Sequence, residues 1–173
     1  MSSVGSGVTD NLETRPWKAA DLTALRAAEP LFPPDTYPRR FIAGSRQLRP
    51  LHRKVEHRLA EPEHRWTGQV ALTGDRLVAL AECSWDPADP GTGTLAVNVA
   101  EAWRSGALGY RVLHELVGRC VRLGITTFDL DYAASNIALQ SAIDAIATET
   151  GVRYTLSGVT RAGIGHLTVR AEH

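Results

Sequence analysis

The sequence predicts a mixed α+β domain: a central mixed β-sheet flanked by helices. Two strand-like runs surround Thr73-Gly74-Asp75 within residues 66–85, which indicates an antiparallel hairpin. Farther along, a strand over 94–99, an amphipathic helix and a strand over 125–132 follow one another, which is typical of a strand–helix–strand crossover. A sheet that combines a hairpin with a crossover is mixed and not all-parallel.

The remaining elements follow from periodicity and turn residues. The expected order is a strand (14–17), a helix within 18–32, an exposed helix within 46–61, the hairpin, the crossover, a helix (136–149) and two strands (152–156 and 166–171). Asp21 is the expected N-cap of the first helix, and Gly124 the C-terminal cap of the crossover helix. That helix carries one apolar stripe: Leu108, Val112, Leu113, Leu116, Val117 and Cys120.

Length and composition narrow the class of protein. The 173 residues suit one domain, expected over 13–173 and preceded by a disordered arm over 1–12. The 19 basic residues balance the 19 acidic ones, which argues against nucleic acid as a partner. No apolar run approaches the ~20 residues that span a bilayer, and the N-terminus lacks a secretory pattern. We therefore expect a cytoplasmic protein with no membrane partner.

The sequence gives no indication of a metal site or a disulfide. Cys83 and Cys120 lie in apolar periodic segments, so both are expected as reduced core residues. His52, His57 and His64 have spacings that match no standard zinc pattern, and we expect them on a solvated helix surface. No metal is therefore expected.

A short turn at the start of the crossover helix carries the main functional signal. It lies within NVAEAWRSGALGYRVLHEL, residues 98–116, where Gly106 and Gly109 flank the helix start. A helix N-terminus presents unpaired N–H groups, and glycine lets the backbone approach a phosphate. The dinucleotide fingerprint and the Walker-type loop are both absent. Taken alone, the turn also fits a structural role in which glycines allow close packing.

The surrounding segments resemble the GNAT superfamily of N-acyltransferases. Its acyl-CoA-binding segment, Gln/Arg-x-x-Gly-x-Gly/Ala, is matched at Arg104 and Gly109, with Ala107 in place of the middle glycine. TRPWKAADLTALRAA resembles the opening strand and helix of that superfamily, and PPDTYPRRF resembles a stretch of bacterial protein-lysine acetyltransferases. Asn136 and Gly151-Val152 match further positions in the same order along the chain.

This resemblance implies a fold and a cofactor-binding site. The strand over 94–99 is expected to splay from the next strand, so that backbone groups of Val97 and Val99 pair with the pantetheine arm of acetyl-CoA. Asn136 is expected near the pantetheine or the thioester. The predicted cofactor-binding segment begins at Arg104, and the amides that cradle the pyrophosphate come from Ser105, Gly106, Ala107, Leu108, Gly109 and Tyr110.

Two of the catalytic residues typical of the resembled proteins are replaced in this chain. The backbone N–H of Val99 is the expected oxyanion donor. A glutamate expected near the start of the same strand is replaced by Thr94, so Glu82 on the neighbouring strand is the candidate base, with a solvated strand carboxylate as the alternative. Asp129 and Asp131 are either surface charges or face the acceptor. A frequent tyrosine acid is replaced by Ile143.

The expected activity is that of a GNAT-family N-acetyltransferase. An amine of a protein lysine or a small molecule attacks the thioester of acetyl-CoA, or of another acyl-CoA, directly. The alternative is a degenerate, non-catalytic GNAT-like module that binds acyl-CoA or a partner for sensing or assembly. A monomer or a homodimer is expected, and the neutral charge gives no indication of the acceptor.

Overall fold

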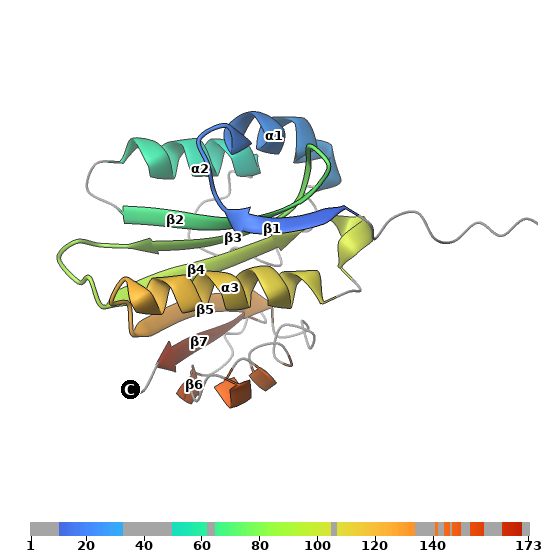
Figure 1. Ribbon diagram of the computed structural model, residues 1–173. Helices are drawn as coiled ribbons and strands as arrows, with labels where there is room; N and C mark the ends of the chain where they lie inside the picture. Colours follow the sequence, from blue (N-terminus) through green and yellow to red (C-terminus); the bar gives the residue numbers. More distant parts are fainter. Residues whose placement is uncertain are drawn as a thin grey trace, which may run out of the picture.

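One sheet with helices on both faces makes up the part of the chain that the computed structural model describes (Figure 1). The described residues are 11–32, 50–61, 65–104, 107–133, 141, 144–145, 147–149, 153–157 and 164–170. Their strands are β1 (Leu12–Pro16), β2 (Arg65–Thr73), β3 (Arg76–Trp85), β4 (Thr92–Val99), β5 (Thr127–Ala133), β6 (Arg153–Ser157) and β7 (Ile164–Arg170). Their helices are α1 (Asp21–Ala28), α2 (Leu51–Ala60) and α3 (Leu108–Arg122), with 3-10 turns at η1 (Glu29–Leu31) and η3 (Glu101–Trp103).

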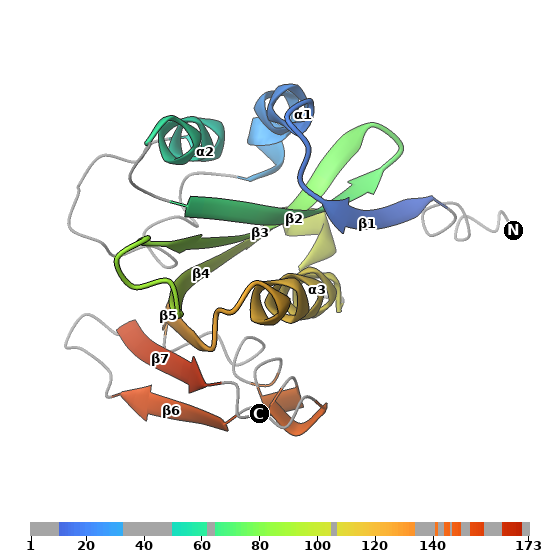
Figure 2. The ribbon, with the colours of Figure 1, turned by 60° about the vertical axis from the view of Figure 1, so that its left-hand side comes forward.

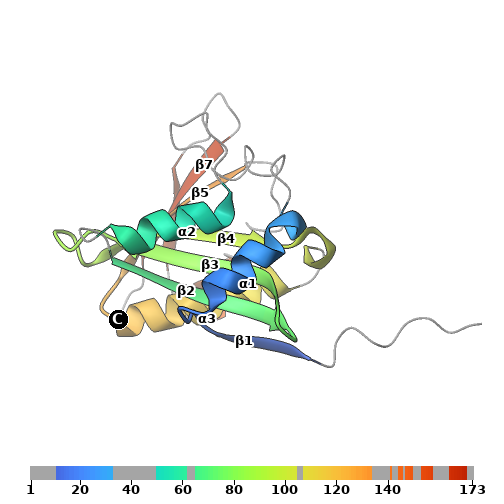
Figure 3. The ribbon, with the colours of Figure 1, turned by 90° about the horizontal axis from the view of Figure 1, so that it is seen from above.

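The sheet is mixed, as the sequence predicts. Its strand order is β1-β2-β3-β4-β5-β7-β6. All neighbours are antiparallel except β4 and β5, which are parallel and are connected through α3. Helices α1 and α2 lie on one face of the sheet and α3 on the other (Figure 2). Seen from above, β5 and β7 turn away from the direction of β2, β3 and β4 (Figure 3).

Several local predictions are confirmed. Gly74 in the β2–β3 turn has φ 61°, and Gly124 after α3 has φ 94°, so each takes a left-handed conformation that favours glycine. The six residues of the predicted stripe are the buried residues of α3. Burial of this stripe against the sheet stabilises α3, because a helix of its length is marginal in water on its own.

Other boundaries differ from the prediction. Strand β1 begins at Leu12, which pairs with Thr73, so the last residue assigned to the arm belongs to the sheet. Helix α2 is amphipathic and not only exposed, because Leu51 and Val55 are fully buried. The arm over 1–10 and the predicted helix start at Asn136 lie outside the described residues. No helix of the described part is long and apolar enough to cross a membrane.

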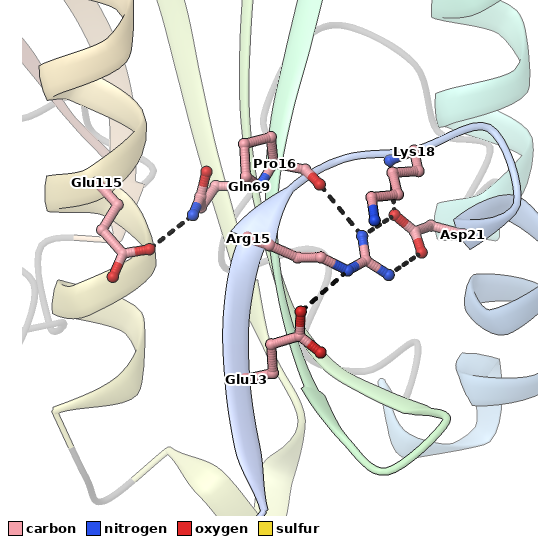
Figure 4. Close-up of polar contacts among 7 residues, drawn as sticks. All are labelled: Glu13, Arg15, Pro16, Lys18, Asp21, Gln69 and Glu115. Carbon is pink, nitrogen blue, oxygen red and sulfur yellow. Dashed lines mark hydrogen bonds and ion pairs between the residues drawn. The ribbon is translucent and has the colours of Figure 1, made fainter.

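Asp21 anchors α1 to β1 instead of acting as its N-cap. It is the first residue of the helix, and the cap residue, Ala20, makes no side-chain cap. The buried carboxylate accepts two bonds from the Arg15 guanidinium, at 2.8 and 2.7 Å, and one from the Lys18 N–H at 2.7 Å (Figure 4). Burial opposes its ionisation, but these bonds outweigh burial and hold the pKa of Asp21 below its ordinary 3.8.

On the other face, Gln69 joins β2 to α3. Its side-chain amide donates to Glu115 at 2.6 Å, on the side of β2 away from Asp21 (Figure 4). Arg119 donates to the Gln69 amide oxygen and to the Gly68 carbonyl. Gln69 is buried and both ends of its amide are bonded, so it holds α3 against the sheet without an unpaired polar group.

The pairing of β4 with β5 is short. Only Thr92–Thr94 of β4 register with Thr127–Asp129 of β5, although β4 continues to Val99 and β5 to Ala133. Beyond Thr94 the register between them ends. The predicted splayed strand pair is therefore confirmed.

Gly93, in the paired part of β4, leaves room for side chains packed on the sheet. A Cβ atom there would lie 2.6 Å from the Cys83 sulfur and 3.2 Å from Ile125 Cγ2. Real Cβ atoms do not approach so closely, so no side chain fits at this position. The absence of a side chain at Gly93 therefore lets Cys83 and Ile125 pack over the segment of β4 that pairs with β5.

We predict that Asp21→Asn lowers the free energy of unfolding at pH 7 by about 1–3 kcal/mol, because it weakens charge-assisted bonds and leaves Arg15 without its counter-ion. A lowered folded pKa gives stability that is present above the unfolded value and is lost as pH falls through the folded value. The difference from wild type should therefore shrink progressively as pH falls below the ordinary value of 3.8 in pH-resolved urea unfolding. Asp75→Asn, at an exposed turn, is the matched control. An equal effect of the two changes would contradict this account.

Candidate active site

The open edge of β4 presents backbone groups of Val97 and Val99. The Ala100 N–H donates to the Val78 carbonyl on β3 at 2.9 Å, and the register pairs Val99 with Ala79 and Val97 with Ala81. Backbone groups of successive residues point to opposite edges of a strand. The N–H and C=O groups of Val97 and Val99 therefore point away from β3, toward the gap beside β5.

Arg104 forms a hydrogen bond with one of these backbone groups, the carbonyl of Val99. Its Nε–H donates to the Val99 carbonyl at 3.1 Å. This bond crosses from the segment after η3 back to the end of β4, so it fixes the turn against the strand. Arg104, expected to bind the cofactor, therefore positions the Val99 backbone, whose N–H remains directed to the gap.

The first turn of α3 lies beside the same edge. Ala107 is its N-cap, makes no side-chain cap bond, and is exposed. The amides of Leu108, Gly109 and Tyr110 are in the first turn, where helices have no internal acceptor for their N–H groups. The helix dipole adds partial positive charge at this end. Ser105 and Gly106, the first two residues of the predicted cradle, lie outside the described residues.

Gly109 also has a packing role. A Cβ atom there would lie 3.2 Å from Val99 Cγ2, which is tighter than most contacts of real Cβ atoms. The glycine therefore lets the first turn of α3 approach the end of β4. The two readings of this turn from sequence, close packing and ligand binding, are compatible in this arrangement.

The Tyr110 side chain points elsewhere. Its hydroxyl donates to the Glu149 carboxylate, and its ring stacks on His114 with ring centroids 5.7 Å apart. The tyrosine thus connects α3 to the helical residues 147–149. Only its backbone amide belongs to the predicted cradle, and Asn136, the last predicted cofactor residue, lies outside the described part of the chain.

Glu82 lies on the face of the sheet that α1 and α2 cover. It is opposite Ala96 of β4 and Gly68 of β2, and it accepts a hydrogen bond from Trp66 Nε1 at 3.1 Å. The side chain keeps some contact with solvent, but protein atoms surround the carboxylate. This desolvation raises the pKa of Glu82, although the bond from Trp66 and the nearby positive charges oppose the rise.

Two cations of α2 lie near Glu82. Arg58 and Lys54 both interact with its charge. Burial lowers the pKa of Lys54, while Glu82 and Glu29 act to raise it. Glu29 accepts bonds from the N–H groups of Leu51 and His52, at 2.8 and 3.3 Å, and so fixes the start of α2. Glu82 therefore belongs to a cluster of charged side chains. It is not the isolated, solvated carboxylate of the alternative expectation.

Thr94, which stands where the resembled proteins have a glutamate, cannot act as a base. Thr94 is exposed, and it pairs with Ser84 on one side and Asp129 on the other. The carboxylate of Asp129 accepts a bond from the Thr168 hydroxyl at 2.7 Å. Among the carboxylates considered from the sequence, Glu82 has a clearly raised pKa.

Sequence reasoning missed three residues of this region. Asn98 alternates with the apolar Val97 and Val99 along β4, and it is buried. Lys54 and Arg58 were expected only as parts of an exposed helix. The positions of Lys54 and Arg58 near Glu82 depend on how α2 packs against the sheet, which spacing along the chain does not reveal. The one available signal was Asn98 itself, a polar residue inside an apolar strand.

The cysteines are core residues, as predicted. Cys83 and Cys120 are free thiols, and both are fully buried. A hydrogen bond with Cys120, together with burial, raises the pKa of Cys83, so neither geometry nor ionisation suits it as a nucleophile. Within the described residues, no three His, Cys, Asp or Glu side chains are grouped to hold a metal ion.

Comparison with known proteins gives structural matches only. No protein-family model and no curated protein sequence matches the chain. The solved GNAT domain of Streptomyces lividans PAT matches with TM-score 0.67 and 17% identity, over 90% of this chain and 88% of that one. Salmonella typhimurium yncA, a putative acetyltransferase with acetyl-CoA, matches with TM-score 0.68 and 13% identity, over 94% and 95%.

A third match is spermidine N-acetyltransferase from Vibrio cholerae in complex with CoA and spermine. Its TM-score is 0.65 at 9% identity, over 94% of this chain and 97% of that one. The TM-scores of 0.65 to 0.68 show that these three structures share the fold described above. The chain has the GNAT fold. At such identities the likeness establishes the fold alone, so the chemistry of this domain has to be argued from its own residues.

Proposed function

We propose that this protein is an acyl-CoA-dependent N-acyltransferase. The observation that carries the proposal is the separation of β4 from β5 beside the N-terminus of α3. The open edge of β4 offers backbone N–H and C=O groups that can pair as in a β-sheet. The N-terminus of α3 offers backbone amides that suit a phosphate. Acetyl-CoA, with an amide-containing arm and a pyrophosphate, matches both. The acetyl-CoA in the yncA structure and the CoA in the Vibrio cholerae structure support this assignment.

The binding mode uses the backbone. The pantetheine arm lies along the open edge of β4 and pairs with Val97 and with the Val99 N–H. The pyrophosphate lies at the first turn of α3, at the amides of Leu108 to Tyr110 and, by the resemblance, of Ser105 to Ala107. Because backbone donors need no particular side chain, Ala107 is compatible with this role in place of glycine.

The reaction is direct attack by an unprotonated amine. The amine nitrogen forms a bond to the thioester carbonyl carbon, and negative charge develops on the carbonyl oxygen, where the Val99 N–H donates. Collapse of this intermediate breaks the C–S bond and releases the CoA thiolate. The proton lost by the nitrogen passes to the base, and the thiolate is protonated on leaving.

Glu82 is the proposed base, and it acts through water. From strand spacing and rise, its Cα is roughly 11 Å from that of Val99, one strand across and three residues along. This distance leaves room for the acceptor and one water between the carboxylate and the thioester. A raised pKa brings Glu82 closer to the proton affinity that a base at neutral pH needs.

A second candidate is a module that binds acyl-CoA without turnover. Thr94, in the position of the usual glutamate, favours it. Thermal shift with CoA, together with thiol release from acetyl-CoA in the presence of a panel of amines, separates the candidates. A shift with turnover supports the transferase, and a shift without turnover supports the module. The absence of both would contradict CoA binding altogether.

We predict that Ala107→Asp weakens CoA binding at least about tenfold more than Ala107→Asn does. Both side chains can cap α3, so both variants should keep or raise the melting temperature. Only aspartate places a negative charge where the pyrophosphate would lie. Isothermal titration with CoA at moderate ionic strength measures the difference. Equal affinities for the two variants would remove the pyrophosphate from this turn.

We predict that Glu82→Gln lowers turnover by ~10²–10⁴-fold and leaves CoA affinity unchanged, with partial recovery at high pH, where the amine is unprotonated in solution. A raised folded pKa gives stability that is complete below the ordinary value of 4.5 and is lost as pH rises through the folded value. Glu82→Gln should therefore melt at a higher temperature than wild type at pH 7, and this advantage should shrink toward pH 4.5.

Asp129→Asn provides the comparison for Glu82→Gln, because Asp129 is the other carboxylate at the point where the strands part. Loss of turnover in Asp129→Asn, with normal turnover in Glu82→Gln, would assign the base to Asp129. Normal turnover in both variants would leave water as the proton acceptor.

A further inference from the structure

Two side-chain amides are buried in the described sheet, and they differ in their hydrogen bonds. Gln69 is 3% exposed, and its amide is bonded to Glu115 and Arg119 on the α3 side. Asn98 is 4% exposed, and its Nδ2 has no hydrogen-bond partner among the residues that the structure describes. Buried donors are nearly always paired, so an unpaired one points to a partner that the folded chain does not itself supply.

Asn98 lies next to the proposed reaction centre. It precedes Val99, whose N–H points into the gap, and its own side chain lies on the opposite face of the strand from that of Val99. On this face it is two residues from Ala96, the residue opposite Glu82. Ala96 is small and partly exposed. A carboxylate and an unpaired amide donor thus flank a small residue, on diagonal positions roughly 7–8 Å apart.

The charges around these two groups limit which amine fits. Lys54 and Arg58 of α2 lie within electrostatic reach of Glu82. The face therefore offers one anionic acceptor of hydrogen bonds, two cations and the Asn98 donor. A polyamine would bring further positive charges toward Lys54 and Arg58, which is unfavourable. An amine with an oxygen close to its nitrogen fits better, because the nitrogen can donate to Glu82 while the oxygen accepts from Asn98 or from the cations.

We propose that Asn98 and Glu82 form the acceptor subsite, and that it takes an α-amino group whose neighbouring carbon carries a carbonyl or carboxylate oxygen. The nitrogen faces Glu82 through water, and the oxygen accepts the Asn98 Nδ2–H. A free amino acid and the N-terminus of a peptide share this chemistry. The inference rests on the proposed acyl transfer and defines its acceptor, in place of the lysine or unspecified small molecule expected from the sequence.

The test compares four acceptors by kcat/KM with acetyl-CoA: alaninamide, alanine, isopropylamine and spermine. Rates are referred to the unprotonated amine, since the four differ in basicity. Alaninamide should exceed isopropylamine, which lacks the oxygen, by about 5- to 150-fold, the range expected for one buried hydrogen bond of ~1–3 kcal/mol. Spermine should be the poorest. A higher kcat/KM for alanine than for alaninamide would indicate that the acceptor is a free amino acid. A higher kcat/KM for alaninamide would indicate a peptide N-terminus.

Asn98→Leu, which removes the donor at similar volume, should bring the ratio of alaninamide to isopropylamine close to one. Its melting temperature should stay close to that of wild type, because the Nδ2 donor that it removes has no partner among the described residues. Gln69→Leu is the matched control: it removes a bonded buried amide, so it should lower the melting temperature and keep the wild-type ratio. If a variant does not fold, the ratio of alaninamide to isopropylamine in the wild-type protein still tests the α-amino subsite.

The outcomes separate this inference from the function on which it rests. Turnover of both small amines at equal efficiency, or a preference for spermine, would overturn the α-amino subsite and leave the transferase intact. Binding of CoA with no turnover of any amine would overturn both. An unchanged ratio in folded Asn98→Leu would remove Asn98 from acceptor recognition.

Discussion

The separation of β4 from β5 is the constraint on which the rest of this structure depends. Three residues of each strand pair, and then β4 continues without β5 as far as Val99. Backbone groups at a strand edge need partners, and an edge inside a domain can obtain them from a ligand. The pairing of Thr92–Thr94 with Thr127–Asp129 holds the strands together on one side of the separation. The bond from Arg104 to the Val99 carbonyl fixes the edge on the other side.

The two faces of the sheet then take different roles. On the α3 face, the stripe of apolar side chains and the bonded Gln69 amide provide rigid packing, and the first turn of α3 is held close to Val99 through Gly109. On the α1 and α2 face, Glu82, Lys54 and Arg58 bring charge over β3 and β4. A neutral chain thus concentrates opposite charges locally, and this distribution, not the total, bears on the acceptor.

The sequence predicts the fold well because its strongest signals are local. The α3 stripe, the Gly74 turn and the Gly124 cap each depend on neighbouring residues only, and each is confirmed. Asp21 shows the limit of such reasoning, since its type suits an N-cap but its carboxylate bonds Arg15 across the chain. Tertiary partners of this kind override a local preference.

The site is predictable only in part, for the same reason. The backbone recognition proposed for Val97 and Val99 needs no particular side chain, so these two residues were predicted from the resemblance and not from their residue types. The burial of Asn98 and the charges around Glu82 depend on packing between elements far apart in the chain, which no spacing records. Alternation along β4 places Asn98 on the face opposite Val97 and Val99, but only the packing of the helices shows that this face is buried.

A residue-resolved NMR titration of the isotope-labelled protein with CoA tests the central claim most directly. If CoA lies in the separation between β4 and β5, the amide signals of Val97, Val99 and Leu108–Tyr110 should shift together and saturate with one dissociation constant. The amides of Val70 and Ala71, in the centre of β2, should stay unchanged. Saturable binding that leaves the β4 edge and the first turn of α3 unperturbed would contradict the account.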